Sequence, residues 1–198
     1  MVKKKRGFNI SEQYRESWNY IKESRNFIYI IIGVFLFFAV IGSVFPVPEA
    51  ISKTILEFIE KLLKETQGLS QLELIKYIFV NNLQSSFFGL LLGIIFGIIP
   101  VLFAAINGYL LGFVLSISVM GGGLLVIWRL FPHGIFELPA IFISLGLGLR
   151  LGCFIFQKNI PKSFRKYFWN SLRVFLFIVL PLLIIAAIIE GSFITLLG

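Results

Sequence analysis

The sequence contains few of the residues on which common enzyme active sites depend. It has one histidine, His133, and one cysteine, Cys153. A single cysteine cannot form an intrachain disulfide, and a single histidine is too few for the zinc sites of metalloproteases. The chain also has no G-x-S-x-G nucleophile elbow and no phosphate-binding loop. We therefore expect a protein that is not an enzyme, with no catalytic residues, no metal and no cofactor.

Charged residues are also scarce, and this scarcity argues against a soluble domain. They make up 14% of the 198 residues, whereas hydrophobic residues make up 58%. Soluble domains have about 25% charged residues. The apolar residues occur in uninterrupted runs, and a helix of about 20 apolar residues is long enough to cross a bilayer. The sequence predicts an all-α fold, a polytopic bundle of about five transmembrane helices with additional interfacial amphipathic helices.

The five predicted spans belong to one membrane domain, residues 1–198. The predicted order is an N-terminal helix at 1–26, span 1 at 27–45, an amphipathic segment at 48–77, span 2 at 83–105, span 3 at 109–127, span 4 at 135–156, a basic loop at 157–170 and span 5 at 172–189. No charged residue occurs between Asn81 and Ile127, so a turn must divide that stretch. Asn107-Gly108 is the best candidate, because both residues tolerate positive φ. Pro100 is the alternative, although proline is tolerated inside membrane helices.

The net charge of +8 comes from basic residues concentrated in two segments, 3–25 and 158–173. Both segments flank apolar runs, which is the pattern of the positive-inside rule and not that of a folded nucleic-acid-binding surface. Five crossings place the two segments on the same side of the bilayer, whereas six crossings would separate them. We therefore expect a multi-pass protein of the cell membrane, with its N-terminus cytoplasmic, its C-terminus external, and no nucleic-acid partner.

Two segments have the periodicity of amphipathic helices. In the N-terminal segment, Ile10, Tyr14, Trp18 and Ile21 recur every three or four residues and share one helix face. A basic helix with aromatic residues beside a span is typical of the lipid interface, although a solvated helix packed on loops has the same pattern. The segment at 48–77 combines an apolar stripe with five glutamates. We expect it on the outer leaflet or on the outer end of the bundle.

Small residues recur at intervals of four in the predicted spans 2 to 4. The set consists of Ser85, Gly89, Gly93, Gly97, Gly108, Gly112, Gly148 and Gly152. Membrane helices associate by close packing, and small residues allow their backbones to approach each other. We expect these spans to form a tightly packed core. The groove would be filled by another helix of this chain or, alternatively, by a second subunit of a homodimer.

Four ionisable residues at or near membrane depth form the candidate polar site: Arg129, His133, Glu137 and Arg150. Charges inside a membrane are costly and are therefore functional candidates. The first three are four residues apart, at a break in the helix pattern that contains two prolines and a glycine. If the break is a bent helix or a re-entrant turn, they would converge on a cavity for a proton, an ion or a head group. The alternative is helix capping by Glu137 and an Arg–Glu pair at the external interface.

Several motifs resemble those of the stage II sporulation protein M family. They are PHGIFELPA at 132–140, GLRLG at 148–152, the Asn81-Asn82 pair, and NGYLLG at 107–112. The resemblance extends over most of the chain and implies a polytopic membrane protein of a family found in bacteria and archaea. It also implies a role like that of the namesake, which holds peptidoglycan-remodelling partners at the membrane during forespore engulfment. No catalytic residue follows from the resemblance, and neither does a role in sporulation.

Two functional hypotheses follow. The first is a non-enzymatic membrane scaffold that recruits or positions envelope-associated proteins. Such a scaffold could be a homodimer. The second is a transporter or channel component in which Arg129, His133 and Glu137 line a polar cavity. The two hypotheses differ in what they require of the fold, because a transport pathway needs a water-accessible cavity and a scaffold needs only packed helices and a contact surface.

Overall fold

The computed structural model describes residues 9–45, 49–122 and 127–197, and it describes the side chains in these ranges except at 50, 63, 120–122, 127–136 and 197. Almost all of these residues are helical and no strand occurs among them, which confirms the all-α prediction. Five helices in the described ranges are long and apolar enough to cross a membrane. They are Ile10–Val44, Gln71–Ile94, Ile98–Val119, Glu137–Phe156 and Ile160–Leu196. The predicted number of spans is therefore confirmed.

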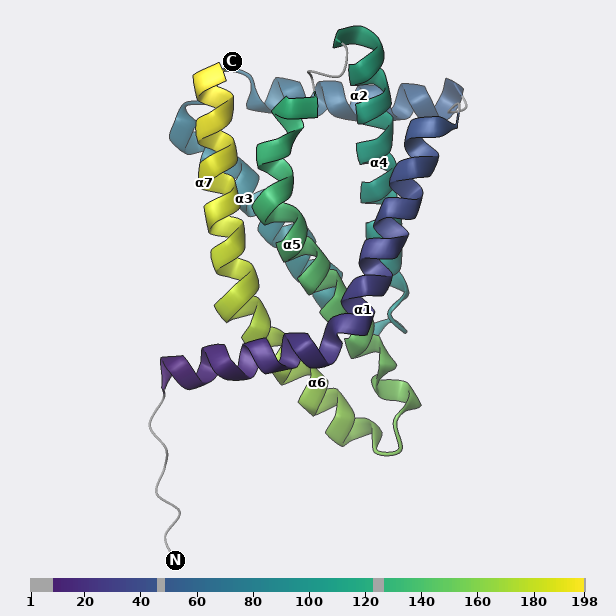
Figure 1. Ribbon diagram of the computed structural model, residues 1–198, viewed down its shortest axis with the longest axis vertical. Coiled ribbons are helices and arrows are strands. Elements are labelled where there is room, and N and C mark those ends of the chain that lie inside the picture. The colour runs from purple at the N-terminus through teal and green to yellow at the C-terminus, as the bar shows by residue number, and fades with distance from the viewer. Residues whose placement is uncertain (1–8, 46–48, 123–126, 198) are drawn as a thin grey trace, which may run out of the picture.

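Helix α1 (Ile10–Val44, 35 residues) is longer than a membrane span. At 1.5 Å per residue it measures about 52 Å, against about 30 Å for the hydrocarbon layer. Figure 1 shows that its first turns run across the lower end of the bundle before the rest of the helix rises through it. The Ser24 hydroxyl donates to the Tyr20 carbonyl at 2.7 Å, and such back-bonding bends helices.

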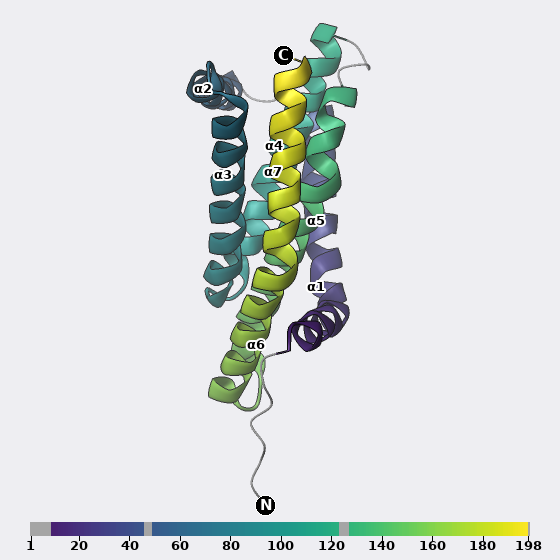
Figure 2. The ribbon, with the colours of Figure 1, turned by 90° about the vertical axis from the view of Figure 1, so that its left-hand side faces the viewer.

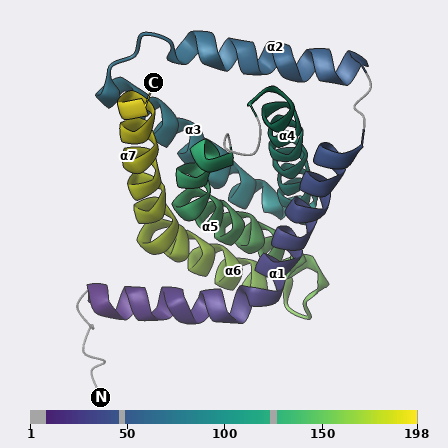
Figure 3. The same cartoon turned by 45° about the horizontal axis from the view of Figure 1, so that its top comes forward.

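The predicted segment at 48–77 forms one helix and the beginning of another. Helix α2 (Glu49–Thr66) lies across the upper end of the bundle, as Figures 1 and 3 show. The chain turns at Gly68, where φ is +81°. The Ser70 backbone N–H then donates to Glu73 Oε2 at 2.9 Å, and this capping box starts helix α3 (Gln71–Leu91). The helix of the second span therefore begins at residue 71 and not at 83.

The turn between the second and third spans lies about ten residues before its predicted position. Helix α3 continues into the short 3-10 helix η1 (Leu92–Ile94), and the chain reverses at Phe96 and Gly97, where φ is +54° and +72°. Helix α4 (Ile98–Gly122) follows. The prediction of a turn at Asn107-Gly108 is wrong, because both residues lie inside α4. The alternative at Pro100 was closer, since this proline is in the first turn of α4, where backbone N–H groups have no intrahelical partner.

Helix α5 (Ile127–Gly152) is continuous through both prolines of the HGIFELP segment. The predicted polar break at 128–134 is therefore wrong, and the fourth helix starts eight residues before the predicted position 135. Proline is accommodated in membrane helices because neighbouring helices and local adjustments satisfy the freed backbone groups. A 3-10 turn, η3 (Cys153–Phe156), ends this helix.

The predicted basic loop at 157–170 is mostly helix. The Asn159 side chain accepts a hydrogen bond from the Lys162 backbone N–H at 3.2 Å and caps helix α6 (Ile160–Val174). The π-helical turn η4 (Phe175–Val179) joins α6 to helix α7 (Leu180–Leu197), so span 5 is the second part of one long helical segment. Figures 1 and 2 show α6 at the lower end, opposite α2 and the C-terminus. The described parts of both basic segments therefore lie at the same end of the bundle.

Helix α5 is in the middle of the bundle, as Figure 3 shows, and contacts α1, α3, α4, α6 and α7. The larger core cluster gathers α5 residues such as Leu147 and Leu151 with Val174 and Leu183 from the last helical segment. A second cluster joins Leu145 to residues of α1 and α4. Glu137 and Arg150, the ionisable residues of α5 whose side chains the structure describes, are thus placed inside the protein and away from lipid.

Candidate functional site

Helices α1 and α4 meet along a line of glycines. A Cβ at Gly108 would contact the Phe35 carbonyl, and one at Gly112 would contact the Ala39 carbonyl. On the facing helix, a Cβ at Gly42 would contact the Tyr109 carbonyl. Backbone therefore packs directly on backbone, as expected for small residues in membrane helices.

A second line of glycines joins α5 to α3 and to the turn after it. A Cβ at Gly93 would contact the Gly148 backbone, and one at Gly152 would contact the Gly97 backbone. A Cβ at Gly148 would lie 2.7 Å from the Gly89 carbonyl oxygen. Five of the eight predicted packing residues therefore meet each other here, within one chain. Ser85 does not take part and is exposed. The predicted homodimer stays a prediction.

Above this contact, α2, α3, α4 and α5 enclose a cavity of about 310 Å³. Its polar lining residues are Asn81, Asn82, Ser85, Ser86, Asn107 and Glu137, and its apolar lining residues are Phe58, Leu62, Phe103, Leu110, Ile141 and Leu145. The Asn81-Asn82 pair, the asparagine of NGYLLG and the glutamate of HGIFELP are far apart in the sequence. The fold brings all three motifs to one place.

Glu137 is the only ionisable residue among the described residues that line this cavity. Its side chain is 5% exposed, and it lies ten residues after the start of α5, which is about 15 Å along the helix. It is therefore not in the first turn, and the helix-capping explanation does not apply. The side chains of Arg129 and His133, which were predicted to converge with it, lie outside the described residues.

The α3 wall of the cavity is polar, and two of its four polar residues are buried. Asn82 and Ser86 are four residues apart on the inner side of the helix and are 8% and 1% exposed. Ser144 of α5 donates to the Ser86 carbonyl at 2.7 Å, which joins the two helices. The Ser86 hydroxyl itself has no hydrogen-bond partner among the described residues. On α4, Asn107 donates to the Phe103 carbonyl at 2.8 Å, which leaves its side-chain carbonyl available to the cavity.

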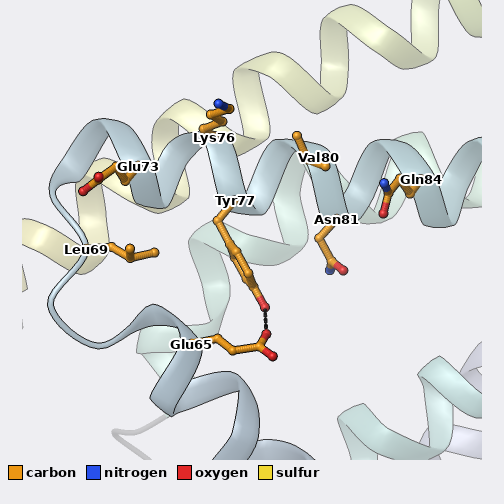
Figure 4. A pocket seen from close by; sticks show the side chains of 8 residues that line it. All are labelled: Glu65, Leu69, Glu73, Lys76, Tyr77, Val80, Asn81 and Gln84. Carbon is orange, nitrogen blue, oxygen red and sulfur yellow. Dashed lines mark hydrogen bonds between the residues drawn. The ribbon is translucent and has the colours of Figure 1, made fainter.

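Helix α2 covers the upper side of the cavity with Phe58 and Leu62. The end of α2 is attached to α3 by a hydrogen bond from the Tyr77 hydroxyl to Glu65 Oε2 at 2.8 Å, which Figure 4 shows. Tyr77 and Glu65 also line a neighbouring pocket of about 430 Å³, which shares Asn81 with the cavity. The cover is thus held in place by a contact that is itself exposed to the surroundings.

Arg150, the fourth predicted site residue, is 13 residues further along α5, about 20 Å from Glu137. The two therefore belong to different sites. The Arg150 guanidinium is 9% exposed. Its Nη1 donates to Ser24 Oγ at 2.7 Å and its Nη2 donates to Glu23 Oε2 at 3.2 Å. The guanidinium carbon lies 4.2 Å from the centre of the Tyr20 ring and 5.2 Å from that of Tyr167.

The Arg150 contacts join three helices at the lower end. Tyr20, Glu23 and Ser24 belong to α1, and Tyr167 belongs to α6. An ion pair between Arg173 and Glu16 adds a second connection between the same two helices. We name the group Tyr20, Glu23, Ser24, Arg150 and Tyr167 the arginine network. Its contacts connect α1, α5 and α6, which indicates that it holds these helices together.

Most of the residues around Glu137 and Arg150 were not among the predicted site residues. Asn82, Ser86 and Asn107 are polar side chains in an otherwise uncharged stretch, and the spacing of Asn82 and Ser86 places them on one face of a helix. That spacing was the available signal for the cavity. For the arginine network the signal was weaker, because Tyr20 and Ser24 precede the apolar run and were assigned to an interfacial helix.

Comparison with known proteins identifies one family. The family model described as Stage II sporulation protein M matches residues 30–195. The uncharacterized protein MJ0706 of Methanocaldococcus jannaschii is 29% identical over 171 residues, which are 83% of this chain and 73% of that relative. No solved structure matches. The family match covers the cavity and, of the arginine network, Arg150 and Tyr167, whereas Tyr20, Glu23 and Ser24 lie before its first residue.

Proposed function

The chain belongs to the stage II sporulation protein M family, and from that premise we propose that this multi-pass membrane protein is a non-enzymatic scaffold of the cell membrane. Its task would be to recruit or position envelope-associated partner proteins. The observation that supports this proposal is the close packing between the cavity and the lower end of the bundle. There Gly93, Gly148 and Gly152 place backbone against backbone, with no space for a methyl group. Such packing suits a rigid support better than a conduit.

The upper end of the bundle offers a contact surface of a suitable kind. Helix α2 lies across it, and the charged side chains of Glu60, Lys61 and Lys64 are 64%, 73% and 71% exposed. Its apolar side is partly turned inward, with Ile55 7% exposed. A partner would therefore meet a charged helix that is held on a rigid base. Such polar, exposed surfaces are typical of interfaces that form and separate.

We further propose that the lower end faces the cytoplasm and the upper end faces outward. The support is that Lys22, Arg25, Lys162 and Arg165 all belong to the helices of the lower end, and basic residues flanking spans are enriched on the cytoplasmic side. Cysteines placed at 22, 57 and 162 in a Cys153→Ala background test the orientation. An impermeant maleimide should label only position 57 on intact cells. Labelling of 22 or 162 without permeabilisation would reverse the orientation or the number of crossings.

Site-specific photo-crosslinking in the native cell tests the scaffold. A photo-reactive amino acid at position 57 or 61 of α2 should give a discrete protein adduct. The same amino acid at position 37 of α1, which is exposed toward lipid, is the matched control and should give none. Adducts of equal intensity at all three positions, or none at any, would contradict the recruiting role.

A transporter or channel component is the second candidate, because the cavity holds a buried carboxylate at membrane depth. Flux through proteoliposomes that contain the parent protein or Glu137→Gln separates the two candidates. Transport is favoured if the parent protein moves a solute and Glu137→Gln does not. If flux is at background level for both proteins, the scaffold is favoured.

A further inference from the structure

We propose that the cavity around Glu137 is a binding site for a small organic ammonium ion, which enters from the side covered by α2. The proposal goes beyond the scaffold role, because a scaffold does not require a ligand. The site combines one buried carboxylate, amide groups from two helices and two phenylalanine side chains around a cavity of about 310 Å³. That volume is at the lower end of the range for small-molecule pockets.

The polar groups of the lining favour a positive charge. Glu137 supplies a carboxylate, and Asn82 and Asn107 supply amide oxygens from α3 and α4. An ammonium group donates up to three hydrogen bonds, and acceptors on three different helices can converge on it. Ser86 is 1% exposed, and its hydroxyl, which has no partner in the part of the chain that the structure describes, adds a further acceptor at the same wall. Charge-assisted hydrogen bonds of this kind are about twice as strong as neutral ones.

The apolar groups of the lining select an organic cation over a metal ion. Phe58 from α2 and Phe103 from α4 both face the cavity. Aromatic faces attract alkylammonium groups and at the same time cover their methylene or methyl groups. A divalent metal ion would need several carboxylate or carbonyl ligands at short range. The described lining residues provide one carboxylate, Glu137, and the described residues contain no cluster of three potential metal-binding side chains.

The location of the cavity determines its entrance. Toward the lower end it is closed by Leu145, which is 2% exposed, and by the glycine contacts beneath it. Toward the upper end it is lined by Phe58 and Leu62 of α2, and the end of this helix is attached to α3 by the exposed Tyr77–Glu65 bond. We infer that a ligand enters past α2, with the ammonium group leading toward Glu137.

Calorimetric titration of the protein in lipid nanodiscs tests the proposal with four chloride salts as probes: n-butylammonium, tetramethylammonium, ammonium and, as the ionic control, sodium. We expect saturable binding of n-butylammonium and tetramethylammonium, and weaker binding of ammonium. Glu137→Gln should lower the affinity for n-butylammonium at least about tenfold. The matched control is Glu190→Gln, because Glu190 is a partly buried span glutamate that does not line the cavity, and it should leave binding unchanged.

Two further variants keep the proposal testable if Glu137→Gln does not fold. Phe103→Leu should weaken tetramethylammonium binding more than ammonium binding, because only the former gains from the aromatic face. Asn107→Asp adds a second negative charge and should tighten n-butylammonium binding. The proposal is overturned if the folded parent binds none of the organic cations more strongly than sodium. It is also overturned if the Glu190 and Glu137 variants lose binding equally. Neither result would affect the photo-crosslinking outcome expected of a scaffold.

Discussion

Glu137 and Arg150 lie on the same helix, and both side chains are almost completely buried, yet their surroundings differ. Arg150 contacts hydrogen-bond acceptors and two aromatic rings, and it does not line the cavity. Glu137 borders a cavity whose polar groups come from three helices, α3, α4 and α5. The comparison shows that burial alone does not indicate what a membrane charge does. A charge that is bonded to side chains of neighbouring helices holds those helices together, whereas a charge that lines a cavity can receive a ligand.

The comparison is tested most strongly by removing the arginine. Arg150→Ala deletes charge-assisted hydrogen bonds to Ser24 and Glu23 and two cation–π contacts. We expect a loss of about 3 kcal/mol in the free energy of unfolding. Unfolding of the detergent-solubilised protein, followed by circular dichroism, measures this loss. If Arg150 instead served a ligand, the variant would keep its stability.

A matched control separates the arginine network from surface electrostatics. Arg15 on α1 is paired with Glu12 at 3.9 Å, and its side chain is 72% exposed. Exposed pairs contribute about 0–1 kcal/mol. Arg15→Ala should therefore change the free energy of unfolding by about 0.5 kcal/mol or less. A loss as large as that of Arg150→Ala would mean that net charge, and not the network, sets the stability.

The glycine contact between the two regions gives the next largest effect. Gly93→Ala places a methyl group against the Gly148 backbone, and backbone cannot move aside as a flexible side chain can. We expect a loss of about 2 kcal/mol in the same unfolding measurement. Gly33→Ala is the control, because nothing lies within 4 Å of a Cβ at that position. Alanine is also the better helix former, so this control should be neutral or slightly stabilising.

At Glu137 we expect the opposite of Arg150: a substitution should change cation binding more than stability. Glu137→Gln keeps the shape of the side chain and its capacity for hydrogen bonds, so we expect the free energy of unfolding to change by less than about 1 kcal/mol. The same variant should lose cation affinity. Arg150→Lys, which keeps the charge at the other end, should be destabilised and bind normally. If Glu137→Gln and Arg150→Lys both lost stability and both kept cation binding, the surroundings of Glu137 and Arg150 would not differ in function.

Much of the architecture could be predicted from the sequence, because it depends on long-range composition. The uncharged stretch between Asn81 and Ile127 is long enough for two spans in any arrangement, and the two basic segments require an odd number of crossings. Both predictions are insensitive to where each helix begins. The described helices confirm the five spans for this reason.

The helix boundaries could not be predicted in the same way, because they depend on local signals that compete. Asn107-Gly108 has the composition of a turn, but close packing on Phe35 explains the glycine, and the reversal occurs at Gly97. The capping box at Ser70 and the cap at Asn159 were visible in the sequence and were outweighed by the interpretation of their segments as surface or loop. Amphipathic patterns do not reveal where a helix enters the membrane.

The candidate site was predicted in part. Glu137 was found because a charge inside a membrane is conspicuous, whereas Asn82, Ser86 and Asn107 are uncharged and occur in other spans. Their convergence depends on the packing of four helices, and single-sequence periodicity contains no information about which helices are neighbours. Arg150 was grouped with Glu137 by depth, and the three-dimensional structure separates them by most of the length of a span.

The smallest expected effect concerns helix α2 beside the cavity. It tests whether the space next to Glu137, unlike the surroundings of Arg150, is accessible from outside. Tyr77→Phe removes the hydrogen bond to Glu65 that attaches the end of α2 to α3. Because the bond is exposed, we expect the free energy that holds α2 against α3 to fall by about 0.5 kcal/mol, which corresponds to about a twofold rise in the population with α2 detached.

A cysteine at Leu62, which lines the cavity from α2, reports this population through its maleimide labelling rate in a Cys153→Ala background. The rate should rise about twofold with Tyr77→Phe, while a cysteine at Ile160, exposed at the opposite end, keeps its rate. A rise at both positions would indicate general loosening of the bundle. An unchanged rate at Leu62 would mean that the attachment of α2 does not control access to Glu137.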